Sequence, residues 1–339
     1  MRNIALSICI PTYNFGEFIG ETIESILPQL MEDMEVLVVD GASTDNTADI
    51  VQRYQRMCPS LRYIRLEKRG GIDLDMAKAV ELSRGDYCWL FSADDIMAKG
   101  AVEKVLNNIR KGADVYILGF TRCTLNLVPI SPHPILEHIE DADYELNDPG
   151  DRRRLFSLAQ TTAAFCSFMS SLVVNRKRWE AKGIDEDFVG SCWAHVARLL
   201  HMIPEGLKVR YLAGEYLLNR GGNDSFLEKG LVHRIGIAID GFHRIAEIFF
   251  GRESIEAYHI RRVLKNEYSL RYLLYAKLVA TEKGGTNDRT RLDTLVEKLF
   301  IDRRPSDNVR LALYRLAPVP ALRVAAAFSR RFRAARPAE

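Results

Sequence analysis

The first 120 residues alternate short apolar runs with amphipathic segments, and no other feature of the chain limits the fold as strongly. Alternation of this kind is typical of βαβ units, so we expect an α/β fold with a doubly wound, mostly parallel sheet. The apolar runs of strand length are Ile4–Ile10, Glu35–Asp40, Leu61–Leu66, Tyr87–Ser92 and Val115–Phe120. The segments with apolar residues at helical spacing are Glu17–Met31, Asp45–Met57, Leu74–Ser83 and Ala101–Arg110.

The remainder of the chain has a different pattern. Thr121–Asp151 is rich in proline and acidic residues without a clear period, and we interpret it as a connecting segment. From Asp151 the pattern is mainly helical, with strand-like runs at Ser171–Asn175 and Leu207–Leu218. After Leu231 it stays helical, and Gly284-Gly285 is its clearest break. Ser43-Thr44-Asp45 supplies candidate N-caps for the second helix, and Arg84-Gly85-Asp86 ends the third.

Composition excludes several classes of protein. The 339 residues carry a formal charge of +2, which gives no support to a nucleic-acid partner. The six cysteines are scattered without zinc-site spacing, and we expect them to be reduced. No apolar run reaches the length of a membrane-spanning helix and the first run is too short for a signal sequence, so we expect a cytoplasmic protein.

Polar motifs follow three of the predicted strands. Because ligands of open parallel sheets bind outside the carboxyl ends of the strands, these motifs predict one shared crevice. Tyr13 offers a flat surface and Asp40 an acceptor for a nucleobase, although Asp40 and Ser43 are also ordinary turn residues. Asp94 and Asp95 are costly after an apolar strand unless a cation or hydrogen bonds compensate them, and an Asp-rich turn is the alternative interpretation. Hard oxygen ligands favour Mn²⁺ or Mg²⁺.

The segments Ile8–Asn14, Val39–Thr47 and Leu90–Asp95 together resemble the family 2 glycosyltransferases of GT-A fold. Gly85–Phe91 and Arg220–Phe226 further resemble the abequosyltransferase-like members, which act in bacterial O-antigen assembly. The resemblance implies a nucleotide-binding core at 1–120, an acceptor-binding and catalytic completion at 121–228 and a helical extension at 229–339. The donor-binding residues that it implies are Pro11, Thr12, Tyr13, Asn14, Asp40, Ser43, Asp73, Lys78, Ala93 and Asp94.

The sequence departs from the family pattern at two places. Ser92 stands where the first acid of the DxD metal motif usually lies, which leaves Asp94 and Asp95 as metal ligands. The acidic pair that usually supplies the catalytic base is also missing. His195 lies nearby and is a competent general base, with Asp187 as the alternative. A helix-face histidine that only packs is an equally good interpretation of His195.

Two further residues are candidates for the reaction. Arg220, in a glycine-rich loop, would stabilise the departing diphosphate. Trp193 would stack on an acceptor sugar, or it belongs to the core. The arginine-rich segment Leu311–Arg336 has almost no acids, so it would lie on an anionic membrane surface or form a solvated helix face.

The resemblance therefore implies an inverting, metal-dependent transfer of a sugar from a nucleotide donor to a glycan or polyprenyl-linked glycan. A dinucleotide-dependent oxidoreductase is excluded because no G-x-G-x-x-G follows the first strand. A non-catalytic relative that binds nucleotide or glycan and scaffolds an assembly complex remains an alternative. An enzyme acting on lipid-linked glycans would sit on the inner face of the cytoplasmic membrane as a peripheral protein.

Overall fold

A computed structural model describes residues 4–324, and its contacts divide the chain into two compact units. The first unit ends at Asn223 and the second begins at Asp224, close to the boundary expected after residue 228. The first unit contains the α/β sheet and the second is helical. The fifteen residues at the carboxyl end, which carry part of the predicted basic segment Leu311–Arg336, lie outside the described residues.

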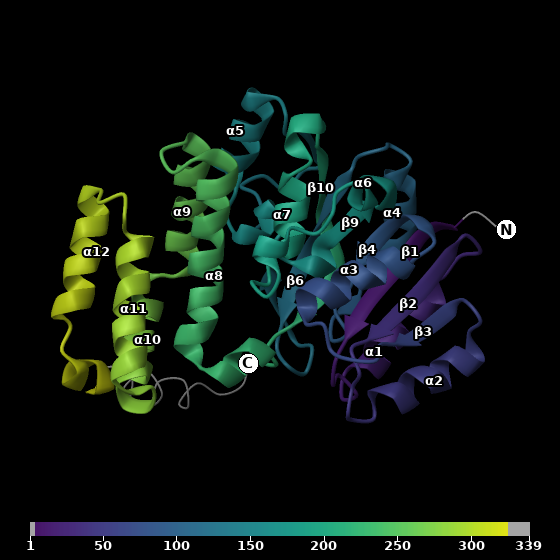
Figure 1. The fold of residues 1–339 in the computed structure, drawn as a ribbon, viewed down its shortest axis with the longest axis horizontal. Coiled ribbons are helices and arrows are strands. Elements are labelled where there is room, and N and C mark those ends of the chain that lie inside the picture. The colour runs from purple at the N-terminus through teal and green to yellow at the C-terminus, as the bar shows by residue number, and fades with distance from the viewer. Residues whose placement is uncertain (1–3, 325–339) are drawn as a thin grey trace. The chain divides into compact units, whose positions relative to one another are not determined.

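The first unit is built on one mixed sheet with the strand order β3-β2-β1-β4-β9-β6-β10-β5 (Figure 1). Strands β3, β2, β1 and β4 are mutually parallel, and β6 is parallel to β10. The antiparallel pairs come from β9, β5, β7 and β8. The bounds are β1 Ile4–Thr12, β2 Met34–Asp40, β3 Leu61–Arg65, β4 Gly85–Leu90, β5 Ile96–Met97, β6 Val115–Cys123, β7 Pro129–Pro132, β8 Ala142–Glu145, β9 Leu172–Asn175 and β10 Lys208–Arg220.

The strand order reverses between β1 and β4, which makes the carboxyl ends of these two strands the topological switch point of the sheet. Right-handed crossovers then place α1 and α2 on one face and α3 on the other. This placement agrees with the packing of α1 on α2 and of α3 on α7. The helices of the unit are α1 Ile19–Ile26, α2 Thr47–Met57, α3 Ile72–Leu82, α4 Ala101–Ile109, α5 Pro149–Leu158, α6 Arg176–Glu180 and α7 Ala194–Leu200.

The centre of the sheet is apolar on both faces, as expected for parallel strands covered by helices. Every residue of β2 is buried, as are the last seven of β1. Strands β6 and β10 of the same sheet also approach each other closely. A Cβ on Gly119 of β6 would lie 2.2 Å from the carbonyl oxygen of Gly214 in β10. The register between β6 and β10 shifts at this point, so the absence of a side chain lets the two strands stay paired.

Two local expectations were wrong. Thr121–Asp151 is not a structureless connection, because β7 pairs with β6 and β8 pairs with β10. These edge strands are short and polar, and tertiary pairing rather than periodicity creates them. The N-cap of α2 is Asn46 rather than a residue of Ser43–Asp45. Asp45 instead accepts, at 3.0 Å, from the backbone N–H of Thr47, which is the first residue of the helix.

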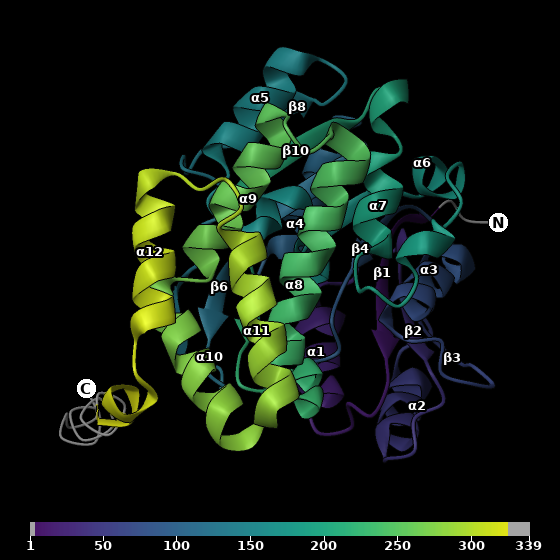
Figure 2. The same ribbon diagram turned by 60° about the vertical axis from the view of Figure 1, so that its left-hand side comes forward.

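The second unit consists of helices (Figure 2). Their buried apolar residues form the core of this unit. Helix α10 packs on α11 and α12, and α8 packs on α9, α10 and α11. The break predicted at Gly284-Gly285 falls between α10 and α11 and is confirmed. Among residues 4–324, no helix combines the length and hydropathy that a membrane crossing requires. The helices are α8 Leu231–Ile245, α9 Ile255–Glu267, α10 Leu270–Lys283, α11 Gly285–Leu299 and α12 Pro305–Leu316, with a π-turn at Ala246–Phe250 after α8.

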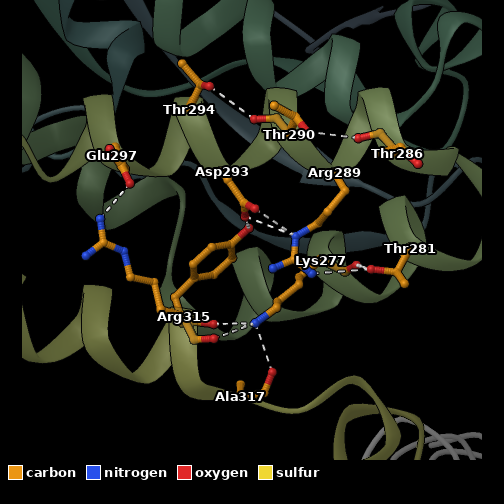
Figure 3. A network of polar contacts seen from close by, with 11 residues as sticks. Lys277, Thr281, Thr286, Arg289, Thr290, Asp293, Thr294, Glu297, Arg315 and Ala317 are labelled. Carbon is orange, nitrogen blue, oxygen red and sulfur yellow. Dashed lines mark hydrogen bonds and ion pairs between the residues drawn. The ribbon is translucent and has the colours of Figure 1, made fainter.

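A buried lysine of α10 satisfies the carbonyl oxygens at the end of the last helix, α12. Lys277 of α10 is 2% exposed, and its ammonium group donates to the carbonyl oxygens of Tyr314, Arg315 and Ala317 at 2.6, 3.2 and 2.9 Å (Figure 3). The last carbonyls of a helix have no partner within it, so Lys277 satisfies the end of α12. The Tyr314 hydroxyl donates to Asp293 of α11 at 2.6 Å. The three helices α10, α11 and α12 are therefore joined by polar contacts as well as by packing.

Candidate active site

The predicted motifs converge on one edge of the sheet. Strands β1, β2, β4, β6 and β10 all run in the same direction, so their carboxyl ends lie at the same edge. The loop after β1 carries Tyr13, the end of β2 carries Asp40, and the loop after β4 carries Asp94. The end of β10 brings Arg220 to this edge from about 125 residues further along the chain. The sequence indicated the first three of these ends, and pairing within the sheet adds the fourth.

The loops after β1 and β2 are bonded to each other. The backbone N–H of Asn14 donates to Ser43 Oγ at 2.9 Å, and the backbone N–H of Thr44 donates to Asn14 Oδ1 at 2.8 Å. Asn14 and Ala42 both have left-handed backbone conformations, with φ of 57° and 65°. Left-handed non-glycine residues are uncommon and persist where surrounding contacts hold them, which is frequent at functional sites. Asn14 and Ser43 therefore shape the loop pair.

Asp40 lies at the bottom of this loop pair and is fully buried. Its Oδ1 accepts from the backbone N–H of Ser43 at 2.8 Å, and its Oδ2 accepts from the hydroxyl of Tyr63 at 2.5 Å. Burial and the contact with Asp40 raise the pKa of Tyr63, so the phenol stays a donor. The sequence did not single out Tyr63. A nucleobase would have to use the remaining lone pairs of Asp40.

The surface beside Asp40 combines an aromatic ring, a cation and an unused hydroxyl. The guanidinium of Arg69 lies over the ring of Tyr13, 3.9 Å from its centroid, as a cation–π contact. Arg69 follows β3, and the sequence did not single it out as a partner of Tyr13. The hydroxyl of Thr12 is buried and has no hydrogen-bond partner among the described residues. Such a group favours a ligand or water nearby.

Asp94 is the accessible acid of the loop after β4. Its carboxylate accepts from the Ser92 hydroxyl and from the side-chain amide of Asn223, and burial raises its pKa. Ala93, beside it, is buried. Mn²⁺ and Mg²⁺ require few protein carboxylates where phosphate oxygens and water complete the shell. One oxygen-rich side chain of this kind fits such an ion.

Asp95 has a different environment. It is 1% exposed, its Oδ2 accepts from the Ser170 hydroxyl at 2.6 Å, and its Oδ1 accepts from Asn219 Nδ2 and from the backbone N–H of Arg220, each at 3.0 Å. Burial and the charge of Asp94 raise the pKa of Asp95 to about 7. No group of three His, Cys, Asp or Glu side chains in residues 4–324 could hold a metal ion. Asp95 therefore supports the loop through these hydrogen bonds, and metal binding stays a prediction for Asp94.

Arg220 is a buried junction of the same edge. Its Nε donates to the carbonyl oxygen of Asp94 at 2.9 Å, its Nη1 donates to the carbonyl oxygen of Leu125 at 2.8 Å, and its Nη2 forms an ion pair with Glu21. The guanidinium also lies 5.0 Å from the ring centroid of Phe18. Arg220 thus lies beside Asp94, and three of its nitrogens donate to protein groups, while its predicted contact with the diphosphate stays a prediction.

His195 is on α7, where 6% of the residue is exposed. One ring nitrogen, Nε2, lies 3.0 Å from the carbonyl oxygen of Cys166. A carbonyl can only accept, so Nε2 carries a proton and Nδ1 holds the lone pair of the neutral ring. Nδ1 is buried without a partner among the described residues. Burial lowers the pKa of His195, which keeps the ring neutral.

The segment after Cys166 connects this histidine to the acids. The backbone N–H of Ser92 donates to Ser170 Oγ at 2.9 Å, and Ser170 in turn binds Asp95. Trp193, the predicted sugar-stacking residue, is 8% exposed, so its ring packs inside the protein in this conformation. Asp187 lies in the short turn Glu186–Phe188 and is exposed.

Asp73 and Lys78, both predicted to contact the donor, have other partners. Asp73 accepts three backbone N–H groups from the turn before α7. Lys78 forms an exposed ion pair with Glu81 on α3 at 2.7 Å. It lines a cleft of about 590 Å³ beside α3 and α6, together with Leu74, Trp179 and Arg198. These contacts do not test the predicted nucleotide roles of the two residues.

Sequence comparison assigns the class of protein. The family described as Glycosyl transferase family 2 matches residues 7–175, which contain most of β1, all of β2 and β4, and the residues Tyr13, Asp40 and Asp94. The chain belongs to this family and is a glycosyltransferase enzyme.

Individual relatives extend the similarity over most of the chain. Abequosyltransferase RfbV of Salmonella typhimurium is 29% identical over 309 residues, which cover 90% of this chain and 92% of that protein. Among solved structures, Staphylococcus aureus TarS 1-349 in complex with UDP-GlcNAc has a TM-score of 0.59 at 17% identity, with 92% of this chain and 87% of that chain covered. The mannosyltransferase PcManGT of Pyrobaculum calidifontis, in complex with GDP-Man and Mn²⁺, has a TM-score of 0.52 at 17% identity, with 95% of this chain and 86% of that chain covered. These structural similarities confirm the predicted GT-A-like α/β fold.

Proposed function

We propose that this chain transfers a sugar from a nucleoside-diphosphate sugar to a hydroxyl of a glycan or lipid-linked glycan. The observation that carries the proposal is the convergence of three strand-end loops, those of Tyr13, Asp40 and Asp94, at the switch point of the sheet. The solved relatives hold UDP-GlcNAc and GDP-Man, which supports a donor of this chemical class.

The donor site is proposed to lie between the first two loops and Asp94. The surface formed by Tyr13 and Arg69 suits a nucleobase, because one offers an aromatic face and the other a planar cation. The unpaired Thr12 hydroxyl and the remaining acceptor capacity of Asp40 would bind polar edges of the nucleoside. Pro11 and Asn14 complete the wall of the site.

Asp94 would hold the divalent ion, with the diphosphate oxygens and water completing the coordination. A bound Mn²⁺ or Mg²⁺ would offset the negative charge that develops on the leaving diphosphate. Arg220 adds a fixed positive charge beside Asp94. Its burial and its contacts with protein groups keep this charge in place without reorganisation.

His195 is proposed to take the proton of the acceptor hydroxyl at Nδ1. Two observations support this role: the donated Nε2 proton leaves Nδ1 as a lone pair, and burial keeps the ring neutral. A general base of this kind contributes about 10²–10⁴-fold to a rate. Deprotonating the acceptor opposite the leaving diphosphate is the geometry of direct displacement, so we propose inversion at the anomeric carbon.

The proposed acceptor class follows the full-length similarity to abequosyltransferase RfbV, which supports a part in O-antigen or related surface polysaccharide synthesis.

The exposed face of α12 supports a peripheral position on an anionic membrane. Val309, Leu313 and Leu316 are 59%, 53% and 79% exposed and spaced to share one side of the helix. Arginines flank them, and Asp307 is buried against Lys265. Apolar and cationic groups on one helix face suit a membrane interface.

The test begins with thermal unfolding of the full chain against UDP, GDP, CDP and dTDP, each with and without Mn²⁺. Selective binding to the native state raises the apparent unfolding temperature. We expect one nucleotide to give a rise that requires the metal, and the matching sugar nucleotide to turn over. His195→Asn should then lower kcat by about 10²-fold or more while the donor dissociation constant stays near that of the wild type.

The scaffold alternative predicts another result. A protein that binds nucleotide and glycan without chemistry would show the thermal shift but no turnover with any donor. Turnover that is unaffected by His195→Asn would retain the enzyme and remove the histidine from its proposed role.

A further inference from the structure

Asp73, in the first turn of α3, is bound by a distant turn of the chain. Its Oδ2 accepts from the backbone N–H groups of Gly190 and Cys192 at 2.9 and 3.0 Å, and its Oδ1 accepts from that of Ala194 at 3.1 Å. The side chain is buried, with 5% of the residue exposed. One carboxylate therefore joins the start of α3 to the Gly190–Ala194 turn, which opens α7.

These three hydrogen bonds stabilise a turn that is unfavourable by itself. Cys192 has a left-handed backbone conformation with φ of 72°, which costs a non-glycine residue about 1–2 kcal/mol. Of the three residues that donate to Asp73, Ala194 is buried, and its N–H would otherwise be a buried donor without a partner. Hydrogen bonds to an ionised acceptor are stronger than neutral ones, so the carboxylate can hold this conformation.

The position of His195 depends on this turn, because His195 directly follows Ala194. The Asp73 carboxylate fixes the backbone on one side of the histidine, and the carbonyl oxygen of Cys166 fixes Nε2 on the other. Cys166 is itself left-handed, with φ of 62°. Two such residues around one imidazole indicate that its placement is held by the surrounding structure.

We propose that Asp73 is a positioning residue for sugar transfer, whose carboxylate fixes the Gly190–Ala194 turn and thereby places the His195 imidazole for proton abstraction. The inference rests on the proposed function, since it takes His195 as the base. It gives Asp73 a role in place of the nucleotide contact expected from the sequence.

The electrostatics supply a second readout. Burial lowers the pKa of His195, while the negative charge of Asp73 on α3 and the carbonyl groups of Cys166 and Ser167 raise it. Asp73 is the charged group that acts on the ring. Removing its charge should lower the pKa of His195, and the acidic limb of the pH–rate profile should move to lower pH with it.

The experiment compares Asp73→Asn, Asp73→Glu and the control Asp75→Asn in the full chain. Asp75 is buried to the same extent on the same helix but accepts from Gly70 at 3.0 Å rather than from the turn. The readouts are the NMR titration of the His195 ring and kcat against donor KM. We expect Asp73→Asn to lower the His195 pKa and to lower kcat by about tenfold or more, with a smaller change in KM. Asp73→Glu should retain the pKa yet lose kcat, and Asp75→Asn should leave the titration unchanged.

The proposal is overturned if folded Asp73→Asn retains both the wild-type kcat and the wild-type His195 titration. If that variant does not fold, wild-type kcat in Asp73→Glu overturns it equally. A wild-type protein that shows no turnover contradicts the proposed function instead. In that case the titration of His195 in the two Asp73 variants still decides whether the carboxylate acts on the imidazole.

Discussion

Two neighbouring carboxylates at the candidate site differ in what surrounds them. Asp94 is partly accessible and contacts Ser92 and Asn223. Asp95 is buried and accepts from three donors of β10 and the segment before β9. Adjacent acids of the same type can therefore have separate tasks, which we propose to be metal binding for Asp94 and loop support for Asp95.

Alanine variants should separate these tasks. Asp95→Ala leaves three donors unsatisfied in the interior, and we expect it to destabilise the fold by about 2–4 kcal/mol. Asp94→Ala should change the unfolding temperature little without ligand but abolish the metal-dependent shift caused by the nucleotide. Thermal unfolding of both variants, with and without nucleotide and Mn²⁺, measures this. A metal-dependent shift retained in Asp94→Ala would contradict the assignment.

Arg220 has a structural role, through its contacts with protein groups, and a predicted catalytic role in stabilising the leaving diphosphate. Because its guanidinium joins Asp94, Leu125 and Glu21, Arg220→Met should lower the unfolding temperature as well as the activity. Assayed below that temperature, it should depress kcat more than donor affinity, since fixed charge acts on the leaving group. Glu21→Gln is the matched control, because it removes only the exposed partner. Loss of donor affinity at unchanged kcat would refute the catalytic part.

At the scale of elements, a charged side chain of α10 satisfies the carbonyl oxygens at the end of α12. Lys277→Met removes the ammonium group that satisfies the carbonyl oxygens of Tyr314, Arg315 and Ala317. Buried carbonyls without partners should destabilise the second unit by about 2–3 kcal/mol. Chemical denaturation measures the loss of stability. The control is Lys283→Met, because Lys283 is exposed at the end of α10, the helix that also carries Lys277. Equal stability of the two variants would show that water replaces the lysine.

Sequence patterns predicted some elements better than others. The five strands with apolar runs appear within a few residues of their expected bounds, because burial on both faces requires continuous apolar residues. Strands β7 and β8 had no such signature, since edge strands are short, polar and defined by their partners. Helices of the second unit followed their periodicity.

At the scale of the whole molecule, the proposed association with an anionic membrane can be tested at the exposed face of α12. Leu313→Asp combined with Leu316→Asp places two charges on the exposed apolar face and should weaken binding of the full chain to anionic vesicles. Ile248→Asp, at a position 52% exposed outside α12, is the control. Sedimentation with vesicles, repeated at raised salt, measures the effect. Binding that is equal for the two proteins would remove α12 from the interface.

The sequence by itself determined the family, the α/β class and the edge of the sheet at which the polar motifs meet. It could do so because Tyr13, Asp40 and Asp94 each follow directly on a strand with a strong apolar signature. The position of a strand end depends on local residues, and parallel strands bring such ends together without further information.

Only the tertiary structure decided what each polar side chain contacts. Asp73 and the Gly190–Ala194 turn are 117–121 residues apart, and Asp95 meets Arg220 across a gap of 125. Nothing in a local pattern records such pairs, because a buried carboxylate is satisfied by whichever donors the folded chain brings to it. The same acid can therefore be read from the sequence as a ligand of nucleotide or metal and serve in the fold as the support of a loop.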